Sequence, residues 1–279
     1  MSEQPVALVT GGSSGIGEYA VTELLDAGFT VYTVARRVER MKALADAGAH
    51  VFAMDVTDDA SVVAGVQRII DEQGRIDVLV NNAGYGSYGA LEEVPMEEAR
   101  RQFDVNVFGL ARLTQLVLPH MRAQGSGRII NVSSVGGRIW EPLGAWYHAT
   151  KFAVEGLSDS LRAELRPHGV DVVVIQPGAI KTEWAAISAD NLREASSEPA
   201  YAEQVRIGAA VLAKADTVKG ASPPSTVAKT IAKAATARRP KTRYATGGGA
   251  RSVLFMKSLT TDRGWDRAIT TAYRSQARG

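Results

Sequence analysis

The amino-acid sequence contains no cysteine and only four histidines. Without cysteine the chain has no disulfide bonds, thiolate metal ligands or cysteine nucleophiles. The histidines are far apart and form no close ligand pair such as His-Glu-x-x-His; they are His50, His120, His148 and His168. We therefore expect no metal site in this chain.

Long hydrophobic runs are also missing. No apolar stretch approaches the ~20 residues that a membrane-spanning helix needs. The N-terminal segment MSEQPVALVTGG lacks the basic region and apolar stretch of a secretory signal. The hydrophobic fraction of 45% and charged fraction of 22% are ordinary for a globular protein, and 279 residues suffice to bury a large core. We expect a cytoplasmic protein with no transmembrane segment.

The net charge of +2 conceals an asymmetry, because residues 1–237 carry a net charge of −6 and residues 238–279 a net charge of +8. A basic tail can mark a nucleic-acid or anionic-membrane surface, which salt-sensitive retention on heparin or vesicles would reveal. Aromatic residues do not alternate with these charges as stacking platforms would. We favour a solvated edge or a surface facing an acidic patch on a neighbouring subunit, and expect no nucleic-acid partner.

Strand-like and helix-like segments alternate along the chain. Apolar runs predict strands at residues 5–10, 29–35, 50–55, 76–82, 127–134, 170–178 and 242–247. Predicted helices between them end at or near glycine, for example at residues 18–28, 37–48 and 60–74. Apolar strands separated by helices predict an α/β fold, with a parallel sheet covered on both faces.

We expect a single domain over residues 1–279, since no repeat or low-complexity linker divides the chain. Residues from about 183 to 226 break the alternation with SSEPA and GASPPS, and insertions of this kind often form lids over active sites. Residues from about 250 to 279 form a basic C-terminal extension.

A glycine-rich turn, TGGSSGIG at residues 10–17, follows the first predicted strand and opens a helix. Glycine permits a tight turn and close approach of the backbone to a pyrophosphate, and the helix N-terminus offers unpaired N–H groups. The alternative is a connection without a ligand. The strand-turn-helix setting at the start of the chain favours phosphate binding.

Tyr147 and Lys151 are four residues apart in a helix-compatible segment, residues 145–165, so their side chains share one helix face. A phenol with a pKa of about 10 is a poor acid or base at neutral pH, and a nearby ammonium favours the phenolate. The pair can therefore exchange a proton with a carbonyl or alcohol oxygen. The same spacing also occurs in solvated surface helices.

The motifs occur together in a defined order: TGGSSGIG, NNAG at residues 81–84, Asn106, Ser134, Tyr147-x-x-x-Lys151, and Pro-Gly at 177–178 followed by Thr182. This combination resembles the short-chain dehydrogenase/reductase family over about residues 5 to 250. The resemblance implies a three-layer, doubly wound Rossmann fold with a seven-stranded parallel sheet. It also implies an oxidoreductase that moves hydride between a nicotinamide and a carbonyl or secondary alcohol.

The resemblance assigns catalytic roles to four residues. Tyr147 donates a proton during carbonyl reduction and accepts it during alcohol oxidation. Lys151 lowers the pKa of Tyr147 and holds the nicotinamide ribose. Ser134 hydrogen-bonds the substrate oxygen, and its spacing of thirteen residues from Tyr147 favours it over Ser133. Asn106 holds a water in a proton relay to Lys151. Because all four positions are filled, we expect an active enzyme.

The second predicted strand ends at Ala35, where an NAD-specific site normally has an acid. Arg36 and Arg37 follow, and arginine binds a 2′-phosphate through charge-assisted hydrogen bonds. The alternative is that both begin a solvated helix. We predict NADP(H) in preference to NAD(H), with Arg36 as the main phosphate contact and Arg37 assisting.

The resemblance extends the cofactor site further. Asp55 would accept a hydrogen bond from the adenine amino group, although helix capping is an alternative. Asn82 would anchor neighbouring strands, and Thr182 would bond the carboxamide. The full predicted set is Gly11, Ser13, Ser14, Gly15, Ile16, Gly17, Arg36, Arg37, Asp55, Val56, Asn82, Ala83, Gly84, Tyr147, Lys151, Pro177, Gly178, Ile180 and Thr182.

Three segments, residues 85–87, 138–146 and 179–184, are expected to line the substrate pocket. They supply Tyr85, Ile139, Trp140, Pro142 and Trp184, together with Leu143 and Trp146. This composition predicts a mostly apolar pocket for a hydrophobic ketone, aldehyde or alcohol. Packing of some of these side chains in the core or at a subunit contact is the alternative.

Two other functions remain open. A 3-oxoacyl-carrier-protein reductase shares the catalytic residues, but its chain usually stops near the seventh strand. A non-catalytic NADP(H) sensor typically lacks the tyrosine or the lysine. Family members usually form homodimers or homotetramers, and we expect the same here. Four apolar residues, Leu110, Leu113, Leu116 and Val117, suit either a subunit contact or the core.

Overall fold

A single seven-stranded parallel sheet organises the chain. The computed structural model describes residues 4–196, 199–214 and 220–276. The strand order is β3-β2-β1-β4-β5-β6-β7, and every neighbouring pair is parallel. The strands are β1 (Val6–Thr10), β2 (Thr30–Ala35), β3 (His50–Ala53), β4 (Val78–Asn81), β5 (Gly127–Val132), β6 (Val170–Pro177) and β7 (Arg243–Thr246). The predicted doubly wound fold is confirmed.

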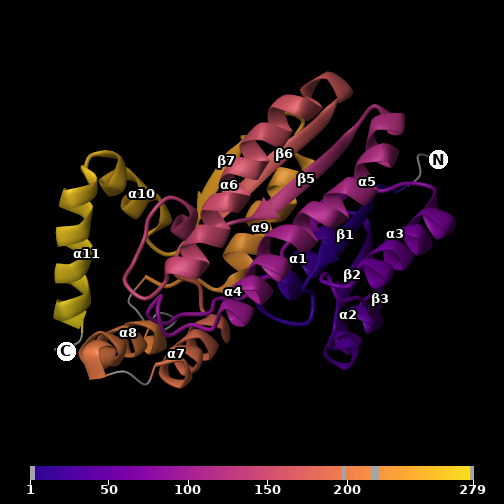
Figure 1. Ribbon diagram of the computed structural model, residues 1–279. Coiled ribbons are helices and arrows are strands. Elements are labelled where there is room, and N and C mark those ends of the chain that lie inside the picture. The colour runs from indigo at the N-terminus through magenta and orange to yellow at the C-terminus, as the bar shows by residue number, and fades with distance from the viewer. Residues whose placement is uncertain (1–3, 197–198, 215–219, 277–279) are drawn as a thin grey trace.

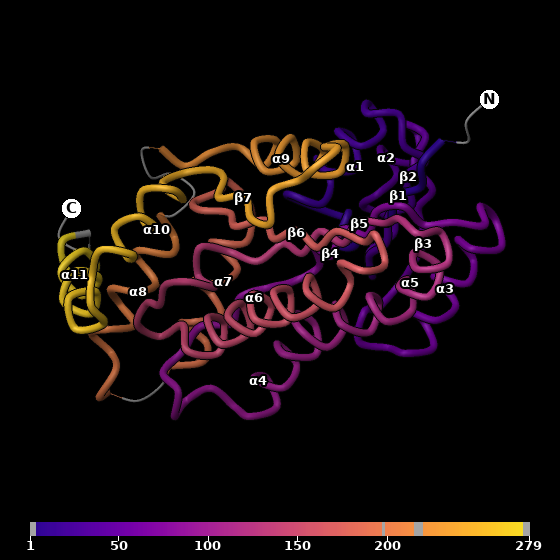
Figure 2. Tube along the Cα trace, turned by 90° about the horizontal axis from the view of Figure 1, so that it is seen from above, coloured from indigo at the N-terminus to yellow at the C-terminus, as the bar shows by residue number. Residues whose placement is uncertain are grey.

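Helices cover both faces of the sheet, α1 and α9 on one side and α3, α5 and α6 on the other (Figure 2). The α-helices are α1 (Gly15–Asp26), α2 (Lys42–Asp46), α3 (Asp59–Gln73), α4 (Met96–Phe103), α5 (Leu110–Gln124), α6 (Ala145–Leu165), α7 (Trp184–Glu194), α8 (Ala202–Lys214), α9 (Pro224–Thr236), α10 (Ala250–Ser258) and α11 (Asp262–Gln276). Short 3₁₀ turns are η1 (Val38–Met41), η3 (Val135–Gly137), η4 (Arg166–His168) and η5 (Pro199–Tyr201), and η2 (Asp104–Gly109) is a π-turn.

Two apolar cores lie on opposite faces of the sheet because successive strand residues point to opposite sides. In β1, Ala7 and Val9 pack with α1 and α9, whereas Val6 and Leu8 pack with α3 and α5. Burial on both faces explains why the strands are continuous apolar runs in the sequence. Leu110, Leu113 and Val117 are buried, and Leu116 packs on the second core, so these four serve the core in the monomer.

A buried polar chain connects β4, β5 and α6. Asn81 Nδ2 donates to Asn131 Oδ1 at 2.9 Å, and Asn131 Nδ2 donates to Ser158 Oγ at 2.9 Å. Buried polar groups cost free energy unless they are paired, so this chain favours one placement of α6 over the sheet. Because α6 carries Tyr147 and Lys151, the chain also places the candidate catalytic groups.

Residues 96–121 do not form one continuous α-helix. A π-turn, η2, separates α4 from α5 and contains Asn106. A Cβ on Gly109 would lie 2.6 Å from the carbonyl oxygen of Val56, so this turn packs directly against the loop after β3. Single π-turns of this kind are frequent at functional sites.

The segment from 183 to 226 contains α7, η5, α8 and the start of α9; residues 197–198 and 215–219 lie outside the described part of the chain. The C-terminal extension forms α10 and α11 at one end of the molecule, where α11 packs against α8 (Figure 1). In the described residues, no helix is long and apolar enough to cross a membrane.

The polar chain makes a graded stability prediction. Asn131→Ala removes two buried hydrogen bonds, while Asn81 keeps its bond to Thr114 and Ser158 its bond to Val154, so we expect urea unfolding to show a loss of about 2–3 kcal/mol. Ser158→Ala removes one of these bonds and should cost about 1 kcal/mol. Equal stability of Asn131→Ala and the parent protein would contradict the role given to this chain.

Candidate active site

The glycine-rich turn lies at the carboxyl end of β1, where α1 begins. Gly11 has φ +74° and Gly15 has φ +58°, a region that favours glycine. A Cβ on Gly17 would overlap the carbonyl oxygen of Gly11, so helix and turn are in direct contact. Ser14 stands at the N-cap without a side-chain cap, so the first N–H groups of α1 are available to an anion.

Thr10 fastens the Asn-Ala-Gly loop after β4 to this turn. Its Oγ1 accepts from the backbone N–H groups of Asn82 at 3.0 Å and Ala83 at 2.9 Å, and Asn82 Nδ2 donates to the carbonyl of Thr10 at 2.9 Å. Asn82 therefore ties neighbouring strands together. The contribution of Thr10 was not predicted, although its position as the last residue of the strand before the turn was visible in the sequence.

The ends of β2 and β3 carry the predicted adenosine contacts. Arg36 and Arg37 are both exposed and follow β2 directly. Partial burial opposes ionisation of Asp55, but hydrogen bonds from Thr57 and the charge of Arg36 outweigh it and hold the pKa of Asp55 below its usual value. The cap of α3 is Asp58, not Asp55, so helix capping does not account for Asp55.

The remaining predicted cofactor residues surround the same edge. Ile180 bridges to Ser222, and a Cβ on Gly178 would overlap the carbonyl oxygen of Gly248. A Cβ on Gly15 would lie 3.3 Å from Thr182 Cγ2, so the turn and the segment after β6 face each other closely. The described residues contain no cluster that could hold a metal ion.

Tyr147 and Lys151 lie on the buried face of α6, with 7% and 8% of their surfaces exposed. Lys151 Nζ donates to the carbonyl oxygen of Val132, at the end of β5, at 3.0 Å. The side chain of Ser134 interacts with the hydroxyl of Tyr147 and lowers its pKa, and Ser134 Oγ accepts from Gly136 N–H at 3.0 Å. The Ser133 hydroxyl is buried without a partner in the described residues. Ser134 is thus the serine that meets Tyr147.

Burial controls the ionisation of both groups. It raises the pKa of Tyr147 to about 12, although the bond with Ser134 opposes this, and the charge of Glu141 raises it further. Burial also lowers the pKa of Lys151 to about 8, against the effect of Glu155. The Lys151 ammonium donates to Val132 and is not among the causes that shift the pKa of Tyr147. The lowering of the Tyr147 pKa by Lys151 stays a prediction.

Asn106 joins three parts of the site. Its Oδ1 accepts from Tyr85 N–H at 3.0 Å, and its Nδ2 donates to the Tyr85 carbonyl at 2.9 Å and to Thr150 Oγ1 at 3.1 Å. A Cβ on Gly84 would lie 3.0 Å from Asn106 Oδ1 and 3.8 Å from Lys151 Nζ. Asn106 therefore holds the loop after β4 beside Lys151, through contacts that the π-turn makes possible.

His148 is a site residue that sequence reasoning missed. It is buried beside Tyr147, its Nδ1 lies 2.9 Å from the carbonyl oxygen of Gly136, and its Nε2 accepts from Glu141 N–H at 3.1 Å. With Nδ1 as a donor, a neutral imidazole satisfies both bonds. His148 thus connects the turn after Ser134 to the loop before α6.

Aromatic side chains enclose Tyr147. The ring centres of Tyr88 and Trp184 lie 5.6 Å and 5.2 Å from that of Tyr147. Apolar residues of α7 and α8 pack behind them, namely Ala189, Leu192, Ala209 and Leu212, with Leu143. Tyr88 was not predicted. Its spacing from the NNAG motif gives no signal, because the intervening loop is irregular.

Other predicted pocket residues lie elsewhere. Tyr85 donates to Glu98 Oε1 at 3.0 Å and stacks under Arg101, both from α4. Trp140 is turned toward α11, where its Nε1 donates to Asp266 Oδ1 at 2.9 Å. Ile139 is buried, Pro142 is partly buried, and Trp146 packs edge-on against Phe103. Trp184 is the predicted pocket residue whose ring contacts Tyr147.

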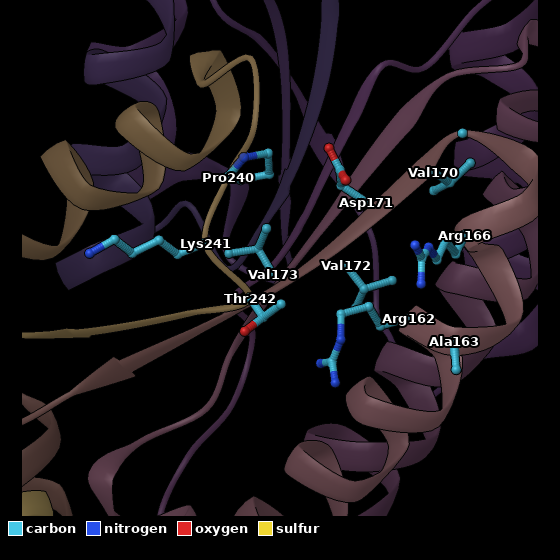
Figure 3. Close-up of a pocket in the computed structure, with 11 residues that line it drawn as sticks. Arg162, Ala163, Arg166, Val170, Asp171, Val172, Val173, Pro240, Lys241 and Thr242 are labelled. Atoms are coloured by element: carbon cyan, nitrogen blue, oxygen red, sulfur yellow. The ribbon is translucent and has the colours of Figure 1, made fainter.

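A separate cavity of about 480 Å³ lies at the opposite edge of the sheet (Figure 3). Its lining includes Arg162 of α6, Arg166 of η4, the first residues of β6 and residues 240–242. Arg162 lies ~22 Å along α6 from Tyr147 at the rise of an α-helix. This cavity is therefore not part of the candidate active site.

The buried ammonium of Lys151 predicts a pH-dependent stability. Its pKa is about 8 when folded and about 10.4 in an unfolded chain. Between these values the unfolded chain binds more protons, so the stability of the parent protein should rise with pH relative to Lys151→Met. The difference in unfolding free energy should change by about 3 kcal/mol across this interval. A constant difference would contradict the burial of a titrating ammonium.

Sequence comparison connects this geometry to known proteins. Residues 5–192 match the family described as short chain dehydrogenase. An uncharacterized oxidoreductase, YusZ of Bacillus subtilis, is 36% identical over 95% of this chain and 96% of its own length. The 3-ketodihydrosphingosine reductase of Bacteroides thetaiotaomicron is 41% identical over 63% of this chain and 64% of its own. The NADPH-dependent 3-dehydrocapnine reductase of Ornithobacterium rhinotracheale is 39% identical over 63% of this chain and 66% of its own length.

Solved structures agree with the fold. A short-chain dehydrogenase from Streptomyces avermitilis superposes with a TM-score of 0.80 at 35% identity, over 100% of this chain and 99% of that one. A metagenomic short-chain oxidoreductase in complex with NADP superposes with a TM-score of 0.68 at 28% identity, over 86% of this chain and 95% of that one. A short-chain dehydrogenase/reductase from Burkholderia phymatum in complex with NAD superposes with a TM-score of 0.77 at 25% identity, over 92% of each chain. The chain therefore belongs to the short-chain dehydrogenase/reductase family of NAD(P)-dependent oxidoreductases, which act on alcohol and carbonyl groups.

Proposed function

We propose that this enzyme transfers hydride between NADP(H) and the carbonyl or secondary alcohol carbon of a hydrophobic substrate, with Tyr147 as general acid and base. The observation that carries the proposal is the burial of Tyr147 and Lys151 on one face of α6, with Ser134 interacting with the Tyr147 hydroxyl. All three stand at the edge of the sheet to which the glycine-rich turn also belongs.

The bound nicotinamide supplies or accepts the hydride at carbon. Ser134 Oγ accepts a hydrogen bond from Gly136 N–H, so its O–H remains the donor and can turn from Tyr147 to the substrate oxygen. Tyr147 delivers its proton to the same oxygen during reduction and takes it back during oxidation. The resulting phenolate is stabilised by the Ser134 hydroxyl and by the positive charge of Lys151.

The enclosing residues protect this proton transfer from water. Trp184 and Tyr88 lie on either side of the Tyr147 ring, and α7 and α8 pack behind them. A low-dielectric surrounding strengthens each electrostatic contact at the reacting oxygen. Because Tyr147 is nearly covered, the segment carrying Trp184 must move to admit substrate, and it acts as the lid of the site.

Preference for NADP(H) follows from the charges at the end of β2. Ala35 leaves no acid to repel a 2′-phosphate, and the exposed guanidinium groups of Arg36 and Arg37 form no ion pair among the described residues. The name of the NADPH-dependent relative and the NADP complex support this choice. The NAD complex of another neighbour makes the preference a matter for measurement.

The substrate is proposed to be a hydrophobic ketone. The wall beside Tyr147 is built from Tyr88, Trp184 and the apolar residues of α7 and α8. The names of two relatives, which act on 3-ketodihydrosphingosine and 3-dehydrocapnine, both denote reduction of a carbonyl group. These observations favour reduction of an apolar ketone.

A homodimer or homotetramer is also proposed. Phe108 on η2 and Phe152 on α6 expose 60% and 43% of their surfaces. Exposed aromatic rings on adjoining helices suit contact with a second copy.

The role of Tyr147 is tested by Tyr147→Phe, which keeps the ring and removes the transferable proton. We expect kcat to fall at least about a hundredfold, with NADPH affinity retained. NADPH consumption and NADPH fluorescence titration measure the two quantities. Tyr19→Phe, on the exposed face of α1, is the matched control. Turnover of Tyr147→Phe near the parent rate would overturn the mechanism.

The role of Arg36 is tested by the cofactor preference of Arg36→Ala. The parent enzyme should show a higher kcat/KM with NADPH than with NADH. Loss of the charge-assisted bond should lower kcat/KM for NADPH about 10- to 100-fold and leave that for NADH nearly unchanged. Arg166→Ala, on an exposed residue at the far end of the sheet, serves as the control. A parent enzyme that prefers NADH would refute the cofactor assignment.

A further inference from the structure

The C-terminal extension holds the loop that leads into α6. Trp265 Nε1 of α11 donates to the carbonyl oxygen of Trp140 at 3.0 Å, and the Trp140 ring donates back to Asp266. The ammonium of Lys257 in α10 lies 4.5 Å from the centre of the Trp140 ring. Residues about 125 positions apart in the chain are thus fastened together beside the catalytic helix.

Glu141, the next residue, is fixed from two sides. Tyr273 of α11 donates its hydroxyl to Glu141 Oε2 at 2.9 Å, and the backbone N–H of Glu141 donates to His148 Nε2 at 3.1 Å. Tyr273 and Trp265 are both buried. The position of this carboxylate is therefore determined by α11 and by the residue next to Tyr147.

Glu141 lies one residue away from the reacting phenol: its N–H donates to the His148 ring, and the centre of that ring is 5.6 Å from the centre of the Tyr147 ring. Burial is the main cause that raises the pKa values of Tyr88 and Tyr147. The negative charge of Glu141 raises both pKa values further. Among the described residues, Glu141 forms hydrogen bonds with Tyr273 and His148. No lysine or arginine of the described residues forms an ion pair with it. An uncompensated negative charge at this place opposes formation of the Tyr147 phenolate.

We propose that Glu141 binds a protonated amine carried by the substrate close to its carbonyl group, which makes an amino ketone the preferred substrate class. This inference rests on the proposed function of the site. An ammonium between Glu141 and the reacting oxygen forms a charge-assisted hydrogen bond with the carboxylate. It also cancels the negative charge that disfavours ionisation of Tyr147. Binding and proton transfer then improve together.

The same inference gives the C-terminal extension a role at the active site. Tyr273 orients the carboxylate and Trp265 holds the backbone beside it, so α11 contains positioning residues for substrate recognition. The extension is not merely a solvated basic tail, because its Trp265 and Tyr273 are buried and Trp265 packs against Trp140 in the loop that leads into α6.

A matched pair of ketones tests the proposal: 2-aminooctan-3-one, assayed below the pKa of its amine, and octan-3-one. We expect kcat/KM of the parent enzyme with NADPH to be about tenfold or more higher for the amino ketone. Glu141→Gln should lower the ratio of the two kcat/KM values at least about tenfold. Tyr273→Phe should lower the ratio by less, because the carboxylate remains. Glu164→Gln, an exposed residue at the far end of α6, should not change the ratio.

A binding measurement gives a second readout. With saturating NADPH, calorimetric titration should show octan-2-amine binding more tightly than octan-2-ol, and Glu141→Gln should remove this difference. Equal kcat/KM for both ketones, or an equal loss for both in Glu141→Gln, would overturn the amine site while leaving the proposed function standing. If neither these nor other hydrophobic ketones were reduced by an enzyme that binds NADPH, the proposed function itself would fail.

Discussion

The packing position of α6 on the sheet is the constraint on which the candidate site depends. Three kinds of buried polar contact fix it: Lys151 to the end of β5, Ser158 to Asn131, and Glu155 to Gln176 and Arg243 of β6 and β7. Each bond is modest by itself, but leaving any partner buried and unpaired is costly. The helix therefore has one favourable position, and Tyr147 meets Ser134 there.

The electrostatics of the site follow from this seating. Burial moves the pKa of Tyr147 up and that of Lys151 down, so the surroundings favour the neutral form of each. Ser134 works in the opposite direction, toward the phenolate, whereas Glu141 works against it. The proposed substrate ammonium would shift this balance toward proton transfer. A site tuned in this way responds to the charge of what it binds, which gives it specificity without a large polar surface.

The sequence predicted those parts of the fold that depend on local pattern. Apolar runs marked the strands, and the glycine-rich turn and the Tyr147–Lys151 spacing marked the places where α1 and α6 carry function. Features that depend on distant contacts were missed. The π-turn at Asn106 arises where Gly109 meets Val56, and no periodicity in residues 96–121 reveals that contact.

The substrate side was the least predictable for the same reason. Tyr85 was expected near the substrate but is held by α4, and Tyr88 takes the place against Tyr147. Trp140 was expected in the pocket but faces α11, which lies more than a hundred residues later in the chain. The burial that raises the pKa of Tyr147 was not predicted, because the covering residues come from α7 and α8, whose packing the sequence does not display.

The central claim is that this sheet edge transfers hydride to a carbonyl carbon while Tyr147 serves its oxygen. The most direct test is mass spectrometry of the alcohol formed from a hydrophobic ketone and NADPH carrying deuterium at the transferring position of the nicotinamide ring. The account predicts one deuterium on the carbon that bears the new hydroxyl group. An alcohol formed without that deuterium, or with deuterium elsewhere in the molecule, would contradict it.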